Sequence, residues 1–535
     1  MKNAELIARR LAAEGVRWVF GVPSGPVLPL IEALRGAGVE FVLTTSETSA
    51  GFMATVVGQL SGAPGVCVAT LGPGATNLAT GLGAAWLDRA PVLALTCNVP
   101  TAWLDRRVQM RIDHHTLMEP LTKASLPLRS EALLETLDTA IAVACAEPPG
   151  PVHLDLPEDV ALERFQPTDT ARKPPAPNEV SAPRDTSGDL GAVRAALARS
   201  RRPLLVTGLS LTRSRALGAL RQFVDTQRMP FISTLHAKGC LPESHPWWAG
   251  VLGRARRSDV QALVDRADLL LAVGFDPVEI NYEEWLGQTP VVHVDREPAE
   301  GASELRFVQN GACDLDAAIG ALADLPLLPT DWTPDEIAAH RSQLEAALRP
   351  AGSTLGPHDV LDVLRSALSA DAILAYDVGA HTHQIATQWR TDEPLTCLST
   401  NGWSSMGFGL PAAYAAKLVR PERTVVGVVG DGCFLMTAGE LSVARRLGLN
   451  VPVVVLNDGW LGLIKVKQER KRYALEGVYL GQPPDSPAHY FGVPCRPART
   501  PDELRSALDW ALRLGGPSVI EAFVDVEPYS TTVYD

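Results

Sequence analysis

The chain has 535 residues, of which 46% are hydrophobic and 20% are charged, and its formal net charge is −13 at pH 7. This composition is that of a folded globular protein, and the length predicts two to four domains. Nucleic acids and anionic membranes are bound through basic surfaces, so the acidic balance argues against both as partners.

The sequence also argues against export and membrane insertion. No stretch approaches the roughly 18 consecutive apolar residues of a membrane span. Met1–Ala13 mixes charged with apolar positions, unlike a secretory signal. The 8 cysteines are scattered and include no Cys-x-x-Cys pair, which predicts buried free thiols in a reducing compartment. We therefore expect a cytoplasmic protein.

Short apolar runs alternate with helical patterns along the chain, which predicts βα units and an α/β fold. Two segments interrupt the alternation and are expected to be linkers, at 166–188 and 326–356. The expected domains are N-terminal (1–165), central (189–325) and C-terminal (357–535), each a mostly parallel sheet flanked by helices.

The expected strands are apolar runs that end in glycine or polar residues. They lie at 18–22, 41–45, 65–70, 91–96, 203–208, 269–274, 291–295, 372–377, 424–432, 451–458 and 517–525. Ligands of parallel sheets bind at the carboxyl ends of the strands, where these polar residues would gather.

The strongest functional feature is the segment from Gly430 to Asp458. One apolar strand ends in Gly-Asp-Gly, a helix follows, and the next strand ends in Asn457-Asp458. Adjacent parallel strands would bring Asp431 and Asp458 together as hard oxygen donors, which suits Mg²⁺ shared with a phosphate. Gly432 and the helix start would offer N–H groups to that phosphate. Two ordinary strand-end turns are the competing interpretation.

A second feature is Glu47, which follows a predicted strand and begins a helix that is apolar along its length. A carboxylate in such a place is costly to bury without a partner. The alternative is an ordinary N-terminal helix residue that the helix dipole stabilises.

The Gly430–Asp458 segment resembles the signature of the thiamine-diphosphate-dependent enzymes, a Gly-Asp-Gly followed, after one helix and one strand, by Asn or Asp. The resemblance implies that Asp431, Asp458 and the backbone carbonyl of Trp460 bind Mg²⁺, with Asn457 as an alternative ligand. It also implies that Gly430 and Gly432 of the Gly-Asp-Gly turn bind the cofactor, together with Cys433, which follows the turn. An Asp at the second position is similar to the catabolic acetolactate synthases.

The same resemblance assigns residues that hold the organic part of the cofactor. The family's activating glutamate, which contacts the aminopyrimidine ring, corresponds to Glu47 and is the expected catalytic residue. The sequence NGWSSMGFGLPAAYAA (401–416) resembles the segment that keeps the cofactor bent, with Met406 between its two rings and the Ser404 carbonyl at the pyrimidine.

Two further loops resemble parts of the family's site. DVGAH (377–381) resembles the loop on the diphosphate side, where Gly379 and His381 are the expected contacts. A solvated loop histidine is the alternative for His381. The loop at 68–82 resembles the acetohydroxyacid synthase loop that lines the active site, and a structural turn is its alternative.

The resemblance covers the whole chain and, through 269–285 and 460–473, is nearest to the flavin-independent catabolic branch of the acetolactate synthases. It implies a carboligase that decarboxylates a 2-oxo acid, with pyruvate as the expected donor, and adds the product to a second carbonyl. Thiamine diphosphate and Mg²⁺ are the implied cofactors. The implied assembly is a homodimer or homotetramer with active sites between subunits.

Several positions depart from the family's pattern and leave the substrates open. Lys467 occupies a specificity position, where it could bind an acceptor carboxylate, phosphate or sulfonate, or point to water. Met110 stands in place of an active-site glutamine, and Ser24 in place of a glycine. The candidate substrate residues are Ser24, Gly25, Gln109, Met110, His114, His115, Leu463 and Lys467.

The rival interpretation is a 2-oxo acid decarboxylase or acyloin lyase that releases an aldehyde. His114 and His115 are similar to the paired histidines of pyruvate decarboxylases, which donate protons, although a surface loop fits them equally well. Ile464 replaces the glutamate that protonates the intermediate in those enzymes, which favours carboligation. A cofactor-free scaffold is a third interpretation, and the retention of Glu47 and Asp431 argues against it.

Overall fold

The structure is a computed structural model and describes residues 1–165, 187–280, 287–301, 305–481 and 485–533. Residues 166–186 of the predicted first linker lie outside the described residues, as do residues 281–285 of the motif at 269–285. The chain forms two compact units. The first is built from described residues of Met1–Ala182, Gly402–Glu422 and Thr437–Leu449, and the second from the other described segments.

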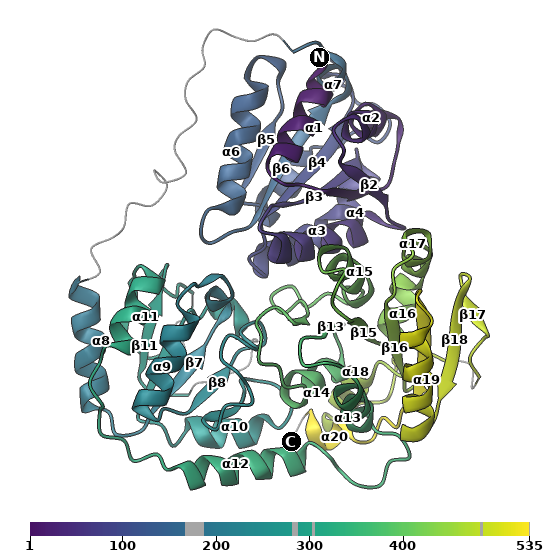
Figure 1. Cartoon of the computed structure of the whole chain (residues 1–535). Coiled ribbons are helices and arrows are strands. Elements are labelled where there is room, and N and C mark those ends of the chain that lie inside the picture. The colour runs from purple at the N-terminus through teal and green to yellow at the C-terminus, as the bar shows by residue number, and fades with distance from the viewer. Residues whose placement is uncertain (166–186, 281–286, 302–304, 482–484, 534–535) are drawn as a thin grey trace. The chain divides into compact units, whose positions relative to one another are not determined.

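The first unit contains a 6-stranded parallel sheet in the order β2-β1-β3-β4-β6-β5 (Figure 1). Its strands are β1 Trp18–Gly21, β2 Glu40–Leu43, β3 Gly65–Thr70, β4 Val92–Asn98, β5 Ala124–Pro127 and β6 Pro151–Pro157. Its N-terminal helices are α1 Asn3–Ala13, α2 Leu28–Gly36, α3 Glu47–Ser61, α4 Pro73–Leu87, α5 His114–Met118, α6 Leu133–Cys145 and α7 Glu158–Leu162. The helices α1, α2, α6 and α7 pack together, whereas α3 packs with α4.

The helix α3 is buried on nearly every side because the first sheet and other helices cover it. At the crossing of α3 and α4, a Cβ added to Gly51 would lie 2.7 Å from the Cα of Gly81. Two glycines therefore let the two backbones meet. The helix α15 (Gly409–Val419) also packs against α3, and the rings of Phe52 and Phe408 meet edge to face at 5.4 Å. The last helix of this unit is α17 Leu441–Leu447.

The second unit contains two sheets, of which the first in the chain is parallel and has the order β12-β11-β10-β7-β8-β9. Its strands are β7 Pro203–Thr207, β8 Phe231–Ser233, β9 Trp248–Val251, β10 Leu269–Val273, β11 Val291–Asp295 and β12 Phe307–Ala312. The accompanying helices are α8 Ser187–Arg199, α9 Leu217–Gln227, α10 Arg257–Val264, α11 Leu315–Ala323 and α12 Pro334–Ala347.

The other sheet of this unit has the order β14-β13-β15-β16-β19-β18-β17, and only the pair β17–β18 is antiparallel. Its strands are β13 Ile373–Tyr376, β14 Cys397–Leu398, β15 Val425–Gly430, β16 Pro452–Asn457, β17 His489–Tyr490, β18 Val493–Ala498 and β19 Ser518–Phe523. Its helices are α13 Pro357–Ala367, α14 Ala380–Gln388, α16 Asp431–Thr437, α18 Gly462–Arg470, α19 Pro501–Arg513 and α20 Tyr529–Thr532. The strands β15 and β16 are neighbours, so their carboxyl ends share one edge.

The predicted α/β class with three mostly parallel sheets is confirmed. Every predicted strand is present, but the strands β5, β6, β8, β9, β12, β14, β17 and β18 were not predicted. The cysteines are free. The expectation of burial is wrong for Cys145, which is exposed, and Cys313 and Cys397 are only partly buried. Among the described helices, none combines the length and apolar character needed to cross a membrane.

Candidate active site

Glu47 is the first residue of α3 and is buried, with 7% of its surface exposed. Ser46 caps the helix, because its hydroxyl accepts a hydrogen bond from the Ser49 N–H. The amide of Asn77 on α4 donates to Glu47 Oε2 at 3.1 Å. The backbone of Gly74 lies beside the other oxygen, since an added Cβ there would be 3.2 Å from Glu47 Oε1. The start of α4 therefore forms one wall around this carboxylate.

Asn77 was not predicted as a site residue, although it lies within 68–82. That segment was predicted to be a loop, but it is helical from Pro73 onward. A second residue that sequence reasoning missed is Glu440. Its Oε1 accepts hydrogen bonds from the Thr45 hydroxyl and from the Thr45 N–H, the latter at 3.1 Å. Burial, opposed by these hydrogen bonds, raises the pKa of Glu440. A second buried acid is thus hydrogen-bonded to Thr45, two residues before Glu47, and no local sequence pattern predicts it.

The segment predicted to hold the cofactor bent belongs to the same unit as Glu47. In this segment, the Gly402 N–H donates to Asp88 Oδ1 at 2.8 Å, and the Trp403 ring packs against Gly83 of α4. Ser404 is exposed and has a positive φ of 50°. Met406 is partly exposed. The structure therefore places the predicted residues of this segment in a loop that packs on α4, before α15.

Asp431 and Asp458 lie at the carboxyl ends of the neighbouring strands β15 and β16, where the sequence predicted them. The two Asp431 oxygens accept hydrogen bonds from the N–H groups of Gly432 and Gly459, both at 2.8 Å. Burial raises the pKa of Asp431 to about 6. Burial and then the charge of Asp431 raise the pKa of Asp458 well above its usual value. Two adjacent carboxylates that resist ionisation in this way suit a divalent cation, which would favour the charged form of both.

Asn457, the alternative ligand, uses its side chain elsewhere. Its amide nitrogen donates to Glu521 Oε1 on β19 at 2.7 Å. The Trp460 N–H donates to Asp458 Oδ1 at 2.8 Å, and this turn leads into α18. These contacts favour Asp458 over Asn457 as the partner of Asp431.

The loop at 377–381 meets the Gly-Asp-Gly turn directly. The Cys433 thiol contacts the Val378 carbonyl at 3.1 Å. A Cβ added to Gly379 or to Gly430 would lie 2.9 or 3.1 Å from the His381 ring. His381 is buried at the start of α14, so the alternative of a solvated loop histidine is wrong.

His381 offers an unused polar atom at this turn. Its Nε2 is buried and has no hydrogen-bond partner among the residues that the structure describes. Burial lowers its pKa to about 4, so the ring is neutral near pH 7. A buried ring nitrogen without a partner, beside a turn of N–H groups and two acidic side chains, fits a diphosphate with its cation.

The candidate substrate residues are spread over both units. In the first unit, Ser24 precedes a 3₁₀ turn that contains the exposed Gly25, and Gln109 and Met110 are exposed. In the second unit, α18 carries two of them. Leu463 packs on a small apolar cluster with Ala380, Val466 and Tyr529, whereas Lys467 is partly exposed.

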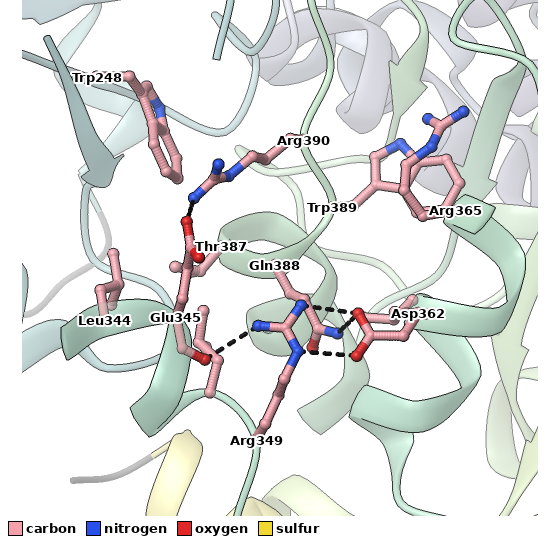
Figure 2. A pocket seen from close by; sticks show the side chains of 12 residues that line it. Trp248, Leu344, Glu345, Arg349, Asp362, Arg365, Thr387, Gln388, Trp389 and Arg390 are labelled. Atoms are coloured by element: carbon pink, nitrogen blue, oxygen red, sulfur yellow. Dashed lines mark hydrogen bonds and ion pairs between the residues drawn. The ribbon is translucent and has the colours of Figure 1, made fainter. Parts of the chain in front are cut away.

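The second unit also has a cleft of about 180 Å³ at which arginines and tryptophans meet (Figure 2). Its charged side chains are paired with one another. Arg349 binds Asp362 at 2.7 Å, Arg390 binds Glu345, and Arg365 stacks on a tryptophan ring. No predicted site residue lines this cleft. We do not assign it to the active site.

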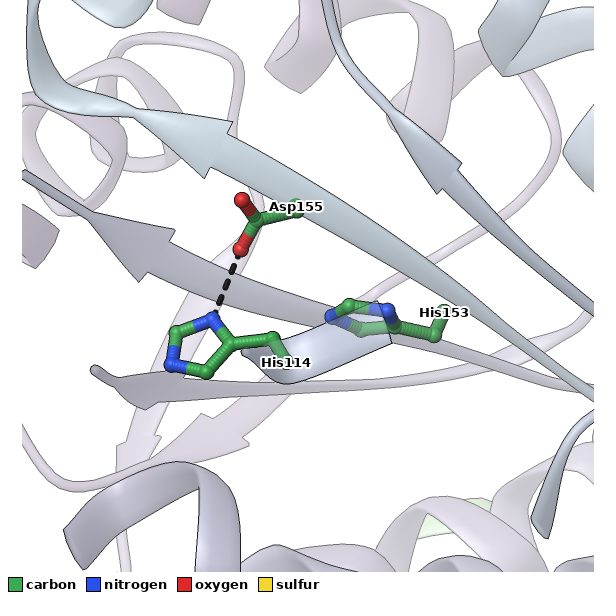
Figure 3. A group of neighbouring side chains, drawn as sticks. All are labelled: His114, His153 and Asp155. Atoms are coloured by element: carbon green, nitrogen blue, oxygen red, sulfur yellow. Dashed lines mark hydrogen bonds and ion pairs between the residues drawn. The ribbon is translucent and has the colours of Figure 1, made fainter. Parts of the chain in front are cut away.

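His114 and His115 differ in their surroundings. His114 is buried, so the surface-loop alternative is wrong for it, and it lies in a group with His153 and Asp155 (Figure 3). His115 is partly exposed, and its Nδ1 contacts the Ser125 hydroxyl at 2.7 Å. The sequence DHHT explains the local fold, because Asp113 caps α5 by accepting from the Thr116 N–H.

Three family models match the chain, and each falls on one of the three sheets. The N-terminal TPP binding domain of the thiamine pyrophosphate enzymes matches residues 1–121, the central domain matches 190–322, and the C-terminal TPP binding domain matches 377–522. Thiamine pyrophosphate is another name for thiamine diphosphate.

Curated relatives match nearly the whole chain. Acetolactate synthase isozyme 2 large subunit of Escherichia coli (strain K12) is 33% identical over 98% of this chain and 96% of its own length. Acetolactate synthase of Bacillus subtilis (strain 168) is 30% identical over 98% and 93%. Acetolactate synthase 1, chloroplastic, of Oryza sativa subsp. japonica is 31% identical over 98% and 84%. The similarity therefore includes all three sheets.

The carboxylate pair predicts a cation requirement that can be measured by thermal unfolding. Mg²⁺ added with thiamine diphosphate should stabilise the wild-type protein by about 2.7 kcal/mol at a concentration 100 times the dissociation constant. Asp431→Asn and Asp458→Asn should remove the part of this shift that depends on Mg²⁺, because each removes a charge that holds the cation. The control is Asp509→Asn on the exposed face of α19, which should keep the full shift. A full Mg²⁺-dependent shift in Asp431→Asn would rule out this metal site.

Proposed function

The chain belongs to the thiamine pyrophosphate enzymes and is related to the acetolactate synthase large subunits, and from this we propose that it acts as a carboligase on 2-oxo acids. Thiamine diphosphate, with Mg²⁺, is its cofactor. The proposed donor is pyruvate, which loses CO₂ before the remaining two-carbon unit is joined to a second carbonyl. If the acceptor is also pyruvate, the product is acetolactate.

The observation that carries this proposal is the buried carboxylate of Glu47 at the start of α3. Asn77 and the Gly74 backbone surround it, and among the described residues Asn77 supplies its side-chain hydrogen bond. A carboxylate with so few donors is costly to bury, so a bound partner that shares a proton with it would be strongly favoured. We assign Glu47 to hold that proton against the N1′ nitrogen of the aminopyrimidine ring.

Bound at this site, the cofactor would supply a nucleophilic carbon and an acceptor for the electrons released when the 2-oxo acid loses CO₂. The chain's own residues bind and orient it. Asp431, Asp458 and the Trp460 carbonyl are the proposed Mg²⁺ ligands. His381 and the N–H groups at the start of α16, after Gly432, are the proposed diphosphate contacts. The hydrogen bonds that fix Asp431 support this assignment, because they orient both of its oxygens before a cation arrives.

Lys467 is the proposed contact for the acceptor substrate. It lies on α18 near other cations, since the pKa of the partly buried His383 is held well below its usual value, first by loss of solvent and then by the charges of Arg254, Lys467 and Arg257. An acceptor that carries a carboxylate, phosphate or sulfonate would be attracted to this basic group. Of the two interpretations of Lys467, we therefore favour anion binding over a solvent-facing role.

The competing function is a decarboxylase that releases an aldehyde. It would use the paired histidines as proton donors, but both ring nitrogens of the buried His114 already contact protein groups. At the position of the protonating glutamate, Ile464 is 42% exposed and has no proton to give. Carboligation is favoured on both grounds.

We further propose a cytoplasmic homodimer or homotetramer in which two copies complete each active site. Glu47 and Asp431 belong to different compact units of the chain. In the family that the sequence resembles, the cofactor is held by the first domain of one subunit and the third domain of another. Sedimentation of the holoprotein would distinguish the two oligomers from a monomer.

The proposed function predicts the products formed from pyruvate. Protein reconstituted with thiamine diphosphate and Mg²⁺ should consume pyruvate and accumulate acetolactate, and both acetolactate and acetaldehyde should be assayed in one reaction. Acetaldehyde without acetolactate would replace the proposal by the decarboxylase. Bound cofactor without pyruvate consumption would show that the donor is a different 2-oxo acid.

The role of Glu47 predicts a large loss of turnover on a nearly isosteric change. Glu47→Gln should lower kcat by roughly 10²–10⁴-fold, because the amide cannot share a proton with the ring. Thiamine diphosphate binding, followed by tryptophan fluorescence, should persist. Glu40→Gln makes the same chemical change on an exposed residue of β2 and should leave kcat as in the wild type. Equal kcat values for the wild type and Glu47→Gln would refute the assignment.

The role of Lys467 predicts a change in the use of the acceptor. Lys467→Gln should lower kcat/KM for the acceptor by about 10-fold to 100-fold, since a charge-assisted hydrogen bond contributes roughly 1.5–3 kcal/mol. The matched control is Lys465→Gln on the same helix, where the lysine pairs with Glu469 at 2.7 Å. If both variants use the acceptor equally well, Lys467 does not bind it.

A further inference from the structure

His114, His153 and Asp155 form a buried group of potential metal ligands in the first unit (Figure 3). Their ligand atoms lie within 4.8 Å of one another. The strand β6 carries His153 and Asp155, and α5 begins with His114. Whether this group can hold a metal ion depends on which of its lone pairs are already in use.

The hydrogen bond from the Gly72 N–H determines which ring nitrogen of His114 carries the proton. This backbone group can only donate, and it lies 3.2 Å from His114 Nε2. The neutral ring therefore carries its proton on Nδ1, which lies 2.8 Å from Asp155 Oδ1. The Asn98 amide donates to the other oxygen of Asp155 at 2.9 Å. Burial opposes ionisation, but these hydrogen bonds lower the pKa of Asp155, so it is the charged acceptor of the group.

The same reasoning determines which ring nitrogen of His153 carries the proton. The Thr96 hydroxyl donates to Asp155 Oδ1 at 2.8 Å, so it accepts the proton of His153 Nε2, which is 2.7 Å away. His153 Nδ1 then accepts from the Ser125 hydroxyl at 2.7 Å, and Ser125 accepts from His115 Nδ1, also at 2.7 Å. Burial lowers the pKa of His153 to about 3, which keeps its ring neutral.

Each ring nitrogen of His114 and His153 thus has a protein partner, and both Asp155 oxygens accept hydrogen bonds. A metal ion could bind only by breaking several of these bonds in a buried site, which costs free energy. The group is therefore a closed hydrogen-bond network, and the bond from the Gly72 N–H to His114 links it to the start of α4.

Gly72 stands immediately before α4. Its φ is +61°, and an added Cβ would lie 2.3 Å from the Met110 carbonyl, so a side chain cannot be accommodated there. Its carbonyl accepts from the Thr76 N–H at 2.9 Å, within the first turn of α4. The bond from Gly72 to His114 therefore fixes the point at which α4 begins.

The first two turns of α4 contact Glu47 twice. An added Cβ on Gly74 would lie 3.2 Å from Glu47 Oε1, and the Asn77 amide donates to Oε2 at 3.1 Å. A shift in the start of α4 would change both contacts. A continuous set of contacts thus leads from Asp155, through His114 and Gly72, to the carboxylate of Glu47.

We propose that His114 is a positioning residue for Glu47, which it orients by accepting the Gly72 hydrogen bond at the start of α4. Asp155 holds His114 in the tautomer that makes this possible. His114 has no proton to give to a substrate in this arrangement, in contrast to the role implied by its similarity to the paired decarboxylase histidines. The effect on turnover rests on the proposed function of Glu47, whereas the effect on α4 does not.

Two substitutions separate the two hydrogen bonds of His114. His114→Gln can keep an acceptor near the position of Nε2 and so retain the Gly72 bond. His114→Asn can keep a donor near the position of Nδ1 and retain the Asp155 bond, but its side chain is too short to reach Gly72. Hydrogen–deuterium exchange of the peptide that contains Gly72–Asn77, measured on the cofactor-free protein, reports on α4. Pyruvate turnover by the holoenzyme reports on Glu47.

We expect His114→Asn to speed exchange in this peptide by about 10-fold, as for the loss of one hydrogen bond, and to lower kcat by about 10-fold with KM unchanged. His114→Gln should stay near the wild type in both measurements. Equal exchange in the two variants, or equal loss of kcat, would overturn the proposal. The two variants could differ in exchange although the protein does not use pyruvate. That outcome would support the link from His114 to α4 and would count only against the proposed function.

A second variant decides the question if His114→Asn does not fold. Asn77→Ala leaves the buried network intact and removes only the bond from α4 to Glu47. It should lower kcat without changing KM for pyruvate. An unchanged kcat would show that α4 does not orient Glu47, and the proposal would fall.

Discussion

The burial of ionisable carboxylates where strands end is the constraint on which the rest of this structure depends. Glu47 begins α3 and Asp431 begins α16, so each lies at a helix N-terminus, where the helix dipole favours negative charge. A helix dipole contributes only about 1 kcal/mol, which is less than the several kcal/mol needed to take a carboxylate out of water. Hydrogen bonds from Asn77 to Glu47 and from two backbone N–H groups to Asp431 supply part of the remaining stabilisation. The proposed cofactor and cation would supply more.

The surrounding fold keeps these carboxylates in place. Parallel pairing of β15 and β16 puts Asp431 and Asp458 at one edge, and the close approach of α3 and α4 at Gly51 and Gly81 brings Asn77 to Glu47. Hydrogen bonds from N–H groups orient both oxygens of Asp431. Each acid is therefore oriented before a ligand binds, as catalysis by preorganised groups requires.

Much of the fold was predictable because strands that are buried on both faces are continuous apolar runs. The strands that were missed lack this pattern. For example, β6 is buried along its whole length but carries His153 and Asp155, which interrupt its apolar run. Others, such as β14 and β17, are only 2 residues long. Tertiary pairing rather than local sequence forms these strands.

In the candidate site, too, the residues that were predicted have a local sequence signal and those that were missed depend on tertiary contacts. Glu47, Asp431 and Asp458 were predicted because a strand end is visible in the local sequence. Glu440 was missed because its partner Thr45 is 395 residues away, and the role of His114 was hidden because it depends on a buried network.

On the resemblance, three of the proposed substrate positions, Ser24, Met110 and Lys467, depart from the family's pattern. Met110 has an exposed side chain, and its carbonyl lies close to Gly72. Lys467 introduces a charge on α18. These departures concern the proposed choice of acceptor and not the proposed cofactor site.

The central claim is that Glu47 acts on the cofactor itself. It is tested most directly by the rate at which the C2 hydrogen of thiamine diphosphate exchanges with D₂O in the presence of protein and Mg²⁺, measured by quenched NMR without any substrate. The account predicts exchange much faster than in free thiamine diphosphate for the wild type, and a rate close to that of the free cofactor for Glu47→Gln. Equally fast exchange in both proteins would contradict it.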